Sequence, residues 1–196
     1  MNSPIIEYYN NGKSEIYYNE NSQLHRDNDK PAFIYYINGN ILSESYYIKH
    51  KRHRENDKPA FILYYENGNI KREEYYINNE LHRCAESGDI ENDKPTIINY
   101  FENGSIQSEY YYINNRLHRG ADSGGRDNNK PAIIEYDNNE NILLERFFIN
   151  GKLRRLNQDY PTIIEYKYGG NDIVNIFTDE EGYELRREEI IGVWNK

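Results

Sequence analysis

Residues 75–83 read YYINNELHR, and residues 111–119 read YYINNRLHR, thirty-six positions further along and changed at one site. A catalytic site needs its reacting groups only once, so a repeated stretch bears first on architecture. Internal repeats of about 20–50 residues are typical of arrays in which each copy buries a face against the next. The repeated nonapeptide therefore predicts an array of similar units.

The six prolines mark the phase of this array. They stand at positions 4, 31, 59, 95, 131 and 161, at intervals of 27, 28, 36, 36 and 30 residues. Each precedes a run rich in isoleucine, phenylalanine and tyrosine, such as PAFIYY at 31–36. We therefore predict a single array of about six units over residues 1–187, each unit starting near one proline. The last nine residues, EEIIGVWNK (188–196), break the pattern and are predicted to cap the array.

Each unit contains two β-type runs separated by turn residues. Asn-Gly pairs at 38–39, 67–68 and 103–104 suit the type I′ turn, which needs positive φ at both central positions. Short β-branched and aromatic runs between such turns favour β-hairpins over helices. Hairpins joined by short links pair in order. The predicted fold is all-β, an elongated and twisted single-layer antiparallel meander of about six stacked hairpins, roughly 55 Å long.

Composition limits the class of protein. The chain has 196 residues, a mean hydropathy of −1.04 and 21 tyrosines, so thin tyrosine-built layers are expected in place of a deep core. The net charge of −9 disfavours binding to nucleic acid and to membrane lipid. Cys84 is the single cysteine, and the N-terminus shows neither a signal peptide nor an apolar span, so a cytoplasmic location is expected. The surplus of Asn, Ile, Lys and Tyr is typical of AT-rich genomes, in some bacteria and large DNA viruses.

Charged and histidine side chains fall into columns when the units are aligned. The glutamates and arginines are predicted either to form cross-strand ion pairs or to expose a basic stripe for phosphate or an acidic partner. The histidines are predicted to be structural or solvent-facing, because equivalent residues lie about 9–10 Å apart, too far to share a zinc ion. The columns are Glu44, Glu73, Glu109 and Glu145; Arg26, Arg54, Arg83, Arg119, Arg155 and Arg187; and His25, His53, His82 and His118.

Paired tyrosines close the second run of most units. Side chains alternate along a strand, so the two members of each pair face opposite sides of the sheet. Two interpretations stay open, a self-packed core or an aromatic surface that binds a partner. The candidate partner-binding tyrosines are Tyr46, Tyr75 and Tyr111.

Two insertions at the same phase supply further candidates. CAESGDIENDK (84–94) and GADSGGRDNNK (120–130) follow consecutive copies of LHR and are predicted to project side by side from one edge of the sheet. They are interpreted as variable surface loops, as partner contacts or, more remotely, as calcium ligands, although the order of an EF-hand loop is missing. The candidate residues are Glu86, Asp89, Asp122 and Arg126, joined by Trp194 in the terminal segment, which is expected to cap the last strand or meet a second chain.

Motifs of catalysis are missing from the sequence. It contains no phosphate-binding glycine loop, no nucleophile elbow, and no HExxH or CxxC motif. Cys84 stands two residues from His82, but no third orienting group can be assigned to them. The sequence therefore predicts a protein that is not an enzyme and that needs neither metal nor cofactor.

The stretches EYYINNELHR (74–83) and PAFILYYENGNI (59–70) resemble the MORN repeat (membrane occupation and recognition nexus). In this comparison Tyr76 lies near the tryptophan of the motif, Asn79 near its turn glycine, and Tyr100–Gly104 along its aromatic strand and turn. The similarity is greatest to degenerate variants in bacterial antitoxin-like and large DNA virus proteins. It implies a single-layer hairpin meander with a scaffold or interaction role. A second resemblance, to choline-binding hairpin repeats, implies an exported protein.

The predicted function is a non-enzymatic repeat scaffold that binds a protein partner or assembles with itself. One alternative is a ligand- or glycan-binding array with aromatic grooves. A second alternative is an antitoxin-like partner of a toxin.

Overall fold

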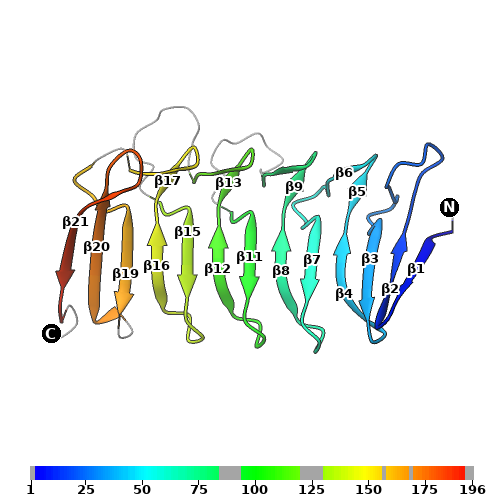
Figure 1. Ribbon diagram of the computed structural model, residues 1–196, viewed down its shortest axis with the longest axis horizontal. Helices are drawn as coiled ribbons and strands as arrows, with labels where there is room; N and C mark the ends of the chain where they lie inside the picture. The colour runs from blue at the N-terminus through cyan, green and yellow to red at the C-terminus, as the bar shows by residue number, and fades with distance from the viewer. Residues whose placement is uncertain (1–2, 84–93, 120–129, 156–157, 168–169, 193–196) are drawn as a thin grey trace.

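The computed structural model describes residues 3–83, 94–119, 130–155, 158–167 and 170–192. It is all-β, with no helix among these residues, and thirteen strands form one open antiparallel sheet (Figure 1). The strands follow one another across the sheet in chain order, from the N-terminus at one end to β21 at the other. The predicted all-β meander of hairpins is confirmed.

The long strands each pair with their neighbours in sequence. They are β1 (Ile5–Tyr9), β2 (Gly12–Ile16), β3 (Phe33–Ile37), β4 (Asn40–Ser45), β7 (Phe61–Tyr64), β8 (Ile70–Glu74), β11 (Ile97–Tyr100), β12 (Ile106–Tyr110), β15 (Ile133–Tyr136), β16 (Ile142–Arg146), β19 (Ile163–Lys167), β20 (Asp172–Thr178) and β21 (Glu184–Ile190). The last of these, β21, adds a strand beyond six hairpins, so residues 188–190 of the predicted cap continue the sheet.

A row of short hairpins lies along one edge of the sheet, at the ends of the long strands (Figure 1). Each contains two strands of two residues, and the first unit has a single bridge, Tyr18 to Leu24, in the same place. The short strands are β5 (Tyr47–Ile48), β6 (Lys51–Arg52), β9 (Tyr76–Ile77), β10 (Glu80–Leu81), β13 (Tyr112–Ile113), β14 (Arg116–Leu117), β17 (Phe148–Ile149) and β18 (Lys152–Leu153). The repeated YYINNELHR is therefore this second, smaller hairpin.

The type I′ turn predicted at the Asn-Gly pairs fits 38–39, where Asn38 and Gly39 have positive φ of 51° and 85°, but not 67–68 or 103–104. In the short hairpins both asparagines have positive φ, 52° and 73° at Asn78 and Asn79, which is the type I′ pattern. At 67–68 only Gly68 has positive φ, at 87°, and the Tyr65 N–H donates to the Asn69 carbonyl at 2.8 Å. That loop has three residues, so a type I turn followed by a left-handed glycine fits it, and the predicted type I′ turn is wrong there.

The second turn residue of each short hairpin, which is Asn79 in the third unit and Asn115 in the fourth, donates its N–H to the preceding unit. The Asn79 N–H donates to the Arg52 carbonyl at 2.9 Å, and the Asn79 Oδ1 accepts the Arg52 N–H at 2.6 Å. Asn115 repeats both contacts with Leu81, at 3.2 and 2.7 Å. In the next unit Gly151 keeps only the backbone bond. Asparagine thus supplies both the left-handed conformation and a side-chain acceptor.

Register places isoleucine and glutamate alternately in one row across a single face of the sheet. Residues directly opposite one another in neighbouring strands lie on the same face. The row reads Ile6, Glu15, Ile34, Glu44, Ile62, Glu73, Ile98, Glu109, Ile134, Glu145 and Ile164. Buried side chains lie on both faces of the sheet. Clusters such as Tyr46, Ala60 and Ile62 join consecutive units on this face, whereas Ile97 and Ile133 are buried on the other.

β-Bulges set this register in the four middle hairpins, between Leu63 and Tyr64 in the third unit for example. The first hairpin has no bulge, and Ile6 rather than Glu7 lies opposite Glu15. Aligning the units by proline places Glu7 in the isoleucine row, so that alignment is off by one residue in the first unit.

Replacing Asn115 tests the double role of the turn asparagines. Asn115→Gly is expected to lower the free energy of unfolding by about 1 kcal/mol, because it removes the bond to Leu81 but tolerates the φ of 64°. Asn115→Ala is expected to cost about 2–3 kcal/mol, because the left-handed conformation adds its own penalty. Denaturant unfolding measures both, with the exposed Glu80→Ala as the control. Equal losses for alanine and glycine would contradict the account.

Candidate functional site

A second row of side chains crosses the same face, beside the isoleucine–glutamate row. Cross-strand pairs of tyrosine and isoleucine form it in five consecutive units, and every member is at least partly exposed. We call it the Tyr–Ile row. Its residues are Tyr36, Ile41, Tyr64, Ile70, Tyr100, Ile106, Tyr136, Ile142, Tyr166 and Ile173.

Hydrogen bonds fix the tyrosines of this row to the preceding unit. The Tyr64 hydroxyl donates to Glu44 at 2.7 Å, and the Tyr100 hydroxyl donates to Glu73 at 2.8 Å. The last two units repeat this bond at 2.9 and 2.8 Å, from Tyr136 to Glu109 and from Tyr166 to Glu145. Burial, followed by the bond to Glu44, raises the pKa of Tyr64 above its ordinary value of 10. A bond to an ionised acceptor is stronger than a neutral one, so each ring is held in one orientation.

The tyrosines predicted to bind a partner lie in the core instead. Tyr46, Tyr75 and Tyr111 are only 7, 7 and 4% exposed. They belong to a ladder in which an arginine guanidinium covers an aromatic ring in each unit. The pairs, with distances from the guanidinium carbon to the ring centroid, are Arg26–Tyr17 (3.5 Å), Arg54–Tyr46 (3.6 Å), Arg83–Tyr75 (3.7 Å), Arg119–Tyr111 (3.8 Å), Arg155–Phe147 (3.4 Å) and Arg186–Phe177 (3.8 Å). These tyrosines are not available as an exposed surface.

Two members of the arginine column, Arg54 and Arg83, pair with aspartates in the links and not with the glutamate column. Asp29 accepts from the Nε of Arg54 at 2.6 Å, from its Nη2 at 3.2 Å, and from the Nζ of Lys58 at 2.6 Å. Asp57 binds Arg83 and Lys94 at the same three distances. We call this arrangement the link clamp. In it the aspartate of one unit holds the arginine and lysine of the next.

Two further details of the arginine column differ from the sequence alignment. The sixth stacked arginine is Arg186, over Phe177, whereas the predicted Arg187 pairs with Glu184 at 3.0 Å. Positive φ at Asn28 (60°) and Asp29 (53°) turns the first link and presents the aspartate to Arg54. No signal in a single unit shows this contact, because its two partners come from different copies.

The histidines also join consecutive units. The Nδ1 of His53 accepts the Asn78 N–H at 3.3 Å, and the Nδ1 of His118 accepts the Asn150 N–H at 3.2 Å. An accepting Nδ1 assigns the ring proton to Nε2 in the neutral form. Among the described residues no three His, Cys, Asp or Glu side chains gather as metal ligands. The structure thus gives these histidines a structural role.

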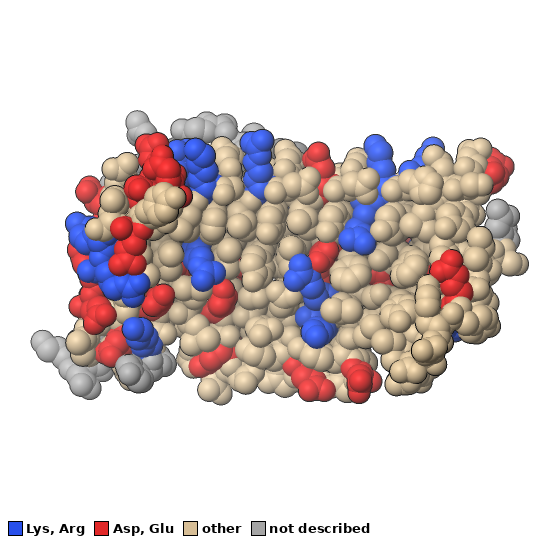
Figure 2. All heavy atoms as spheres, viewed as in Figure 1, with Lys and Arg blue, Asp and Glu red and all other residues tan. Residues whose placement is uncertain are grey.

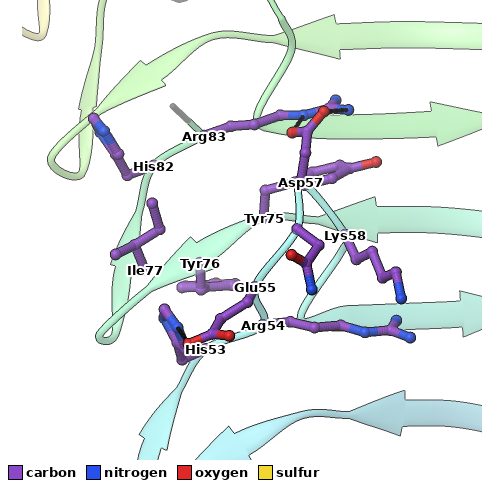
Figure 3. A pocket seen from close by; sticks show the side chains of 11 residues that line it. His53, Arg54, Glu55, Asp57, Lys58, Tyr75, Tyr76, Ile77, His82 and Arg83 are labelled. Atoms are coloured by element: carbon purple, nitrogen blue, oxygen red, sulfur yellow. Dashed lines mark hydrogen bonds and ion pairs between the residues drawn. The ribbon is translucent and has the colours of Figure 1, made fainter. Parts of the chain in front are cut away.

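One hollow of ~240 Å³ lies between the second link and the short hairpin of the third unit (Figure 3). His53 and Glu55 line it from the link, and Tyr76, Ile77 and His82 line it from the hairpin. The arginine at its rim, Arg83, points toward Asp57 and is held in a link clamp (Figure 3). Both guanidinium groups that line the hollow, those of Arg54 and Arg83, are therefore already paired with aspartate.

Charge is unevenly distributed on the surface. Figure 2 shows a face whose middle is covered mainly by uncharged residues, whereas residues of both signs crowd the end of the array that carries β21. The described part of the chain contains no helix that meets the length and apolarity needed to cross a membrane. The middle of this face therefore presents mainly uncharged side chains.

The remaining candidate residues lie outside the described part of the chain. They are Glu86, Asp89, Asp122, Arg126 and Trp194. Sequence reasoning missed the Tyr–Ile row, although a signal for it exists. In the middle units a tyrosine stands two positions after the isoleucine of the first run, as in Ile98 and Tyr100, and an isoleucine follows the turn.

Comparison with known proteins gave no relative. No protein-family model matches the chain, and no curated protein matches it at a significant level. The resemblance to MORN repeats therefore stays a prediction.

Replacing Asp29 tests the link clamp. Asp29→Asn is expected to lower the free energy of unfolding at pH 7 by no more than about 1 kcal/mol, since the side chain is 39% exposed and solvent screens it. The bond from Arg54 leads the lowering of the Asp29 pKa from 3.8 to about 2. The stabilisation is thus present above pH 3.8 and is lost as the pH falls toward 2.

Urea unfolding of wild type and Asp29→Asn at pH 7 and pH 2 measures this effect, with the exposed Glu66→Gln as the control. The difference between wild type and variant should shrink to near zero at pH 2. A difference that is the same at both pH values would show that the carboxylate charge does not act as described.

Alkaline titration tests whether burial raises the pKa of the tyrosines. Burial raises the pKa of Tyr75 from 10 to about 12 and raises that of Tyr100 as well. The folded state therefore resists ionisation, and its stability, full below pH 10, declines as the pH rises toward 12. Tyrosinate absorbance and circular dichroism followed together should show the late-titrating tyrosines ionising with loss of the sheet. Ionisation of all tyrosines near pH 10 with the sheet intact would contradict this prediction.

Proposed function

We propose that the chain is a non-enzymatic scaffold that binds a protein partner along the Tyr–Ile row. The observation that carries the proposal is the recurrence of this uncharged cross-strand pair in five consecutive units. Ten strands at about 4.8 Å give a row roughly 43 Å long. That length suits an elongated segment of a partner laid across the strands.

The chemistry of the row favours a protein partner. Tyrosine is enriched at the energetic centres of protein interfaces, where a large ring gives contact area at low entropic cost. Here the bonds from Tyr64 to Glu44 and from Tyr100 to Glu73 hold the rings before a partner arrives. A surface that is already ordered loses less side-chain freedom on binding.

The use of the polar side chains supports a scaffold over an enzyme. In the described residues the glutamates, arginines and histidines of the columns contact neighbouring units, as Glu109, Arg83 and His53 do. Catalysis needs a nucleophile or a general base whose reactive atoms face a substrate. Side chains that hold the array together in several copies serve stability instead. A toxin as the partner would be one case of the same activity.

Affinity capture from cells of the source organism tests the proposal. The bait is the full chain, compared with the double variant Ile70→Ser, Ile106→Ser in the Tyr–Ile row. The matched control is Lys71→Ser, Gln107→Ser, which changes the next residue in each strand, both exposed. We expect one protein to be captured by wild type and control, and its recovery to fall about tenfold or more with the row variant.

Thermal unfolding of all three baits confirms that each is folded before capture. Equal recovery by the row variant and wild type would remove the Tyr–Ile row as the binding surface. Failure of every bait to enrich a protein, together with a small molecule retained in native mass spectrometry, would favour the ligand-binding alternative.

A further inference from the structure

At the N-terminal end of the array, the first unit carries the basic residues of a link clamp but, within the described part of the chain, lacks the aspartate that binds them in later units. At two boundaries inside the array, a link aspartate binds the arginine and the lysine of the next unit: Asp29 binds Arg54 and Lys58, and Asp57 binds Arg83 and Lys94. In the first unit the counterparts of these two basic residues are Arg26 and Lys30. Among the described residues β1 is the edge strand of the sheet, and no described link on its outer side supplies an aspartate to them.

Arg26 is ordered as if that aspartate were present. Its guanidinium covers Tyr17 at 3.5 Å, and its Nη1 donates to the Pro31 carbonyl at 3.2 Å, as Arg54 does with Tyr46 and Pro59. The Nε of Arg26, however, is buried and has no hydrogen-bond partner among the described residues. In Arg54 and Arg83 the same atom binds aspartate at 2.6 Å. A buried donor without an acceptor is costly, so a carboxylate at this place is favoured.

The strand beside it lacks its partner too. β1 pairs only with β2, and all five of its residues are exposed. Tyr8 occupies the position of Tyr36 in the second unit, opposite Lys13, and is 78% exposed because no earlier strand carries a glutamate beside it. Ile5 and Ile6 are 55 and 42% exposed. This edge therefore presents free backbone groups, apolar side chains and donors for two carboxylates.

The opposite edge of the sheet, β21, has features that block the addition of a further strand. β21 carries five charged residues in seven, and a bulge interrupts its pairing with β20. β1 carries a single charge, Glu7, and no bulge. Charges and bulges are the usual devices that block strand addition to a sheet edge. The two ends thus differ, and strand addition is favoured at β1.

A second copy of the chain does not complete this boundary. The antiparallel sheet has an odd number of strands, thirteen, so β1 and β21 run in the same direction. Head-to-tail stacking would pair β21 with β1 in parallel, against the pattern of the sheet. Two-fold pairing of β1 with itself would bring Glu7 close to its own copy and supply no aspartate to Arg26. The missing element is an antiparallel strand that carries a glutamate and is followed by an aspartate.

We infer that the β1 edge binds an acidic extended segment of another polypeptide by strand addition, with one carboxylate on Arg26 and Lys30 and another on Tyr8. This surface is separate from the Tyr–Ile row, and either interaction can fail without the other. The net charge of −9 repels an acidic partner at long range. At physiological ionic strength that repulsion is screened beyond about 8 Å, whereas short buried contacts persist.

A peptide copied from the chain provides the probe. Residues 12–30 are the segment that precedes the second unit, and they carry Glu15 and Asp29 in the required order. The full-length protein is titrated with this peptide, labelled at its C-terminus, at physiological salt, and with the same peptide carrying Asp29→Asn. We expect saturable binding of the first peptide and about tenfold weaker binding of the second.

Protein variants assign the site. Arg26→Gln and, separately, the exposed Lys30→Gln should weaken binding of the wild-type peptide. Each should also remove most of the difference in affinity between the two peptides. Lys51→Gln, an exposed lysine in β6, should behave as wild type. The inference is overturned if binding of the wild-type peptide does not saturate or if the two peptides bind equally. It is also overturned if Lys30→Gln leaves the difference in affinity between the two peptides unchanged. A dimer of the free protein in sedimentation velocity that Tyr8→Lys dissociates would assign the edge to a second copy and also overturn it.

Discussion

The bond from a tyrosine hydroxyl in one unit to a glutamate in the preceding unit is the interaction on which the rest of the structure depends. It crosses every described boundary from the third unit to the sixth, at 2.7–2.9 Å. By tying the ring down, it covers the isoleucines beneath and leaves the outer surface of the ring as part of the Tyr–Ile row. The same bond therefore serves stability and orders the surface that we propose to bind a partner.

A sheet one layer thick buries little apolar area. Hydrogen bonds and ion pairs between units supply part of the stability that a larger core would give. A mean hydropathy of −1.04 leaves only thin clusters such as Tyr111, Ala132 and Ile134. The link clamps, the asparagine contacts of the short hairpins and the arginine–aromatic stacks each join a unit to its neighbour. Stability in such an array is close to a sum of units and nearest-neighbour boundaries. An end unit lacks one boundary, which is why the β1 edge differs from the interior.

The sequence predicted what depends on a single unit. The all-β class and the order of the hairpins along the sheet follow from local pattern. Contacts between units were not predictable, because Asp29 and Arg54, or Asn79 and Arg52, belong to different copies whose offset is set by bulges and left-handed turns. Tyr75 was predicted as a partner-binding residue but is buried under the guanidinium of Arg83. Arg83 is held there by Asp57 of the preceding link, a contact that the sequence of one unit does not show. The Tyr–Ile row emerges only when register is known.

A double-mutant cycle on Tyr100 and Glu73 tests the central claim most directly. The free energy of unfolding is measured for wild type, Tyr100→Phe, Glu73→Gln and the double variant. The account predicts a coupling energy of about 1–2 kcal/mol, because the 2.8 Å bond joins the third and fourth units and its acceptor is ionised. A coupling energy near zero would mean that the units do not depend on this bond, and the account of a sheet tied together by tyrosine and glutamate would be wrong.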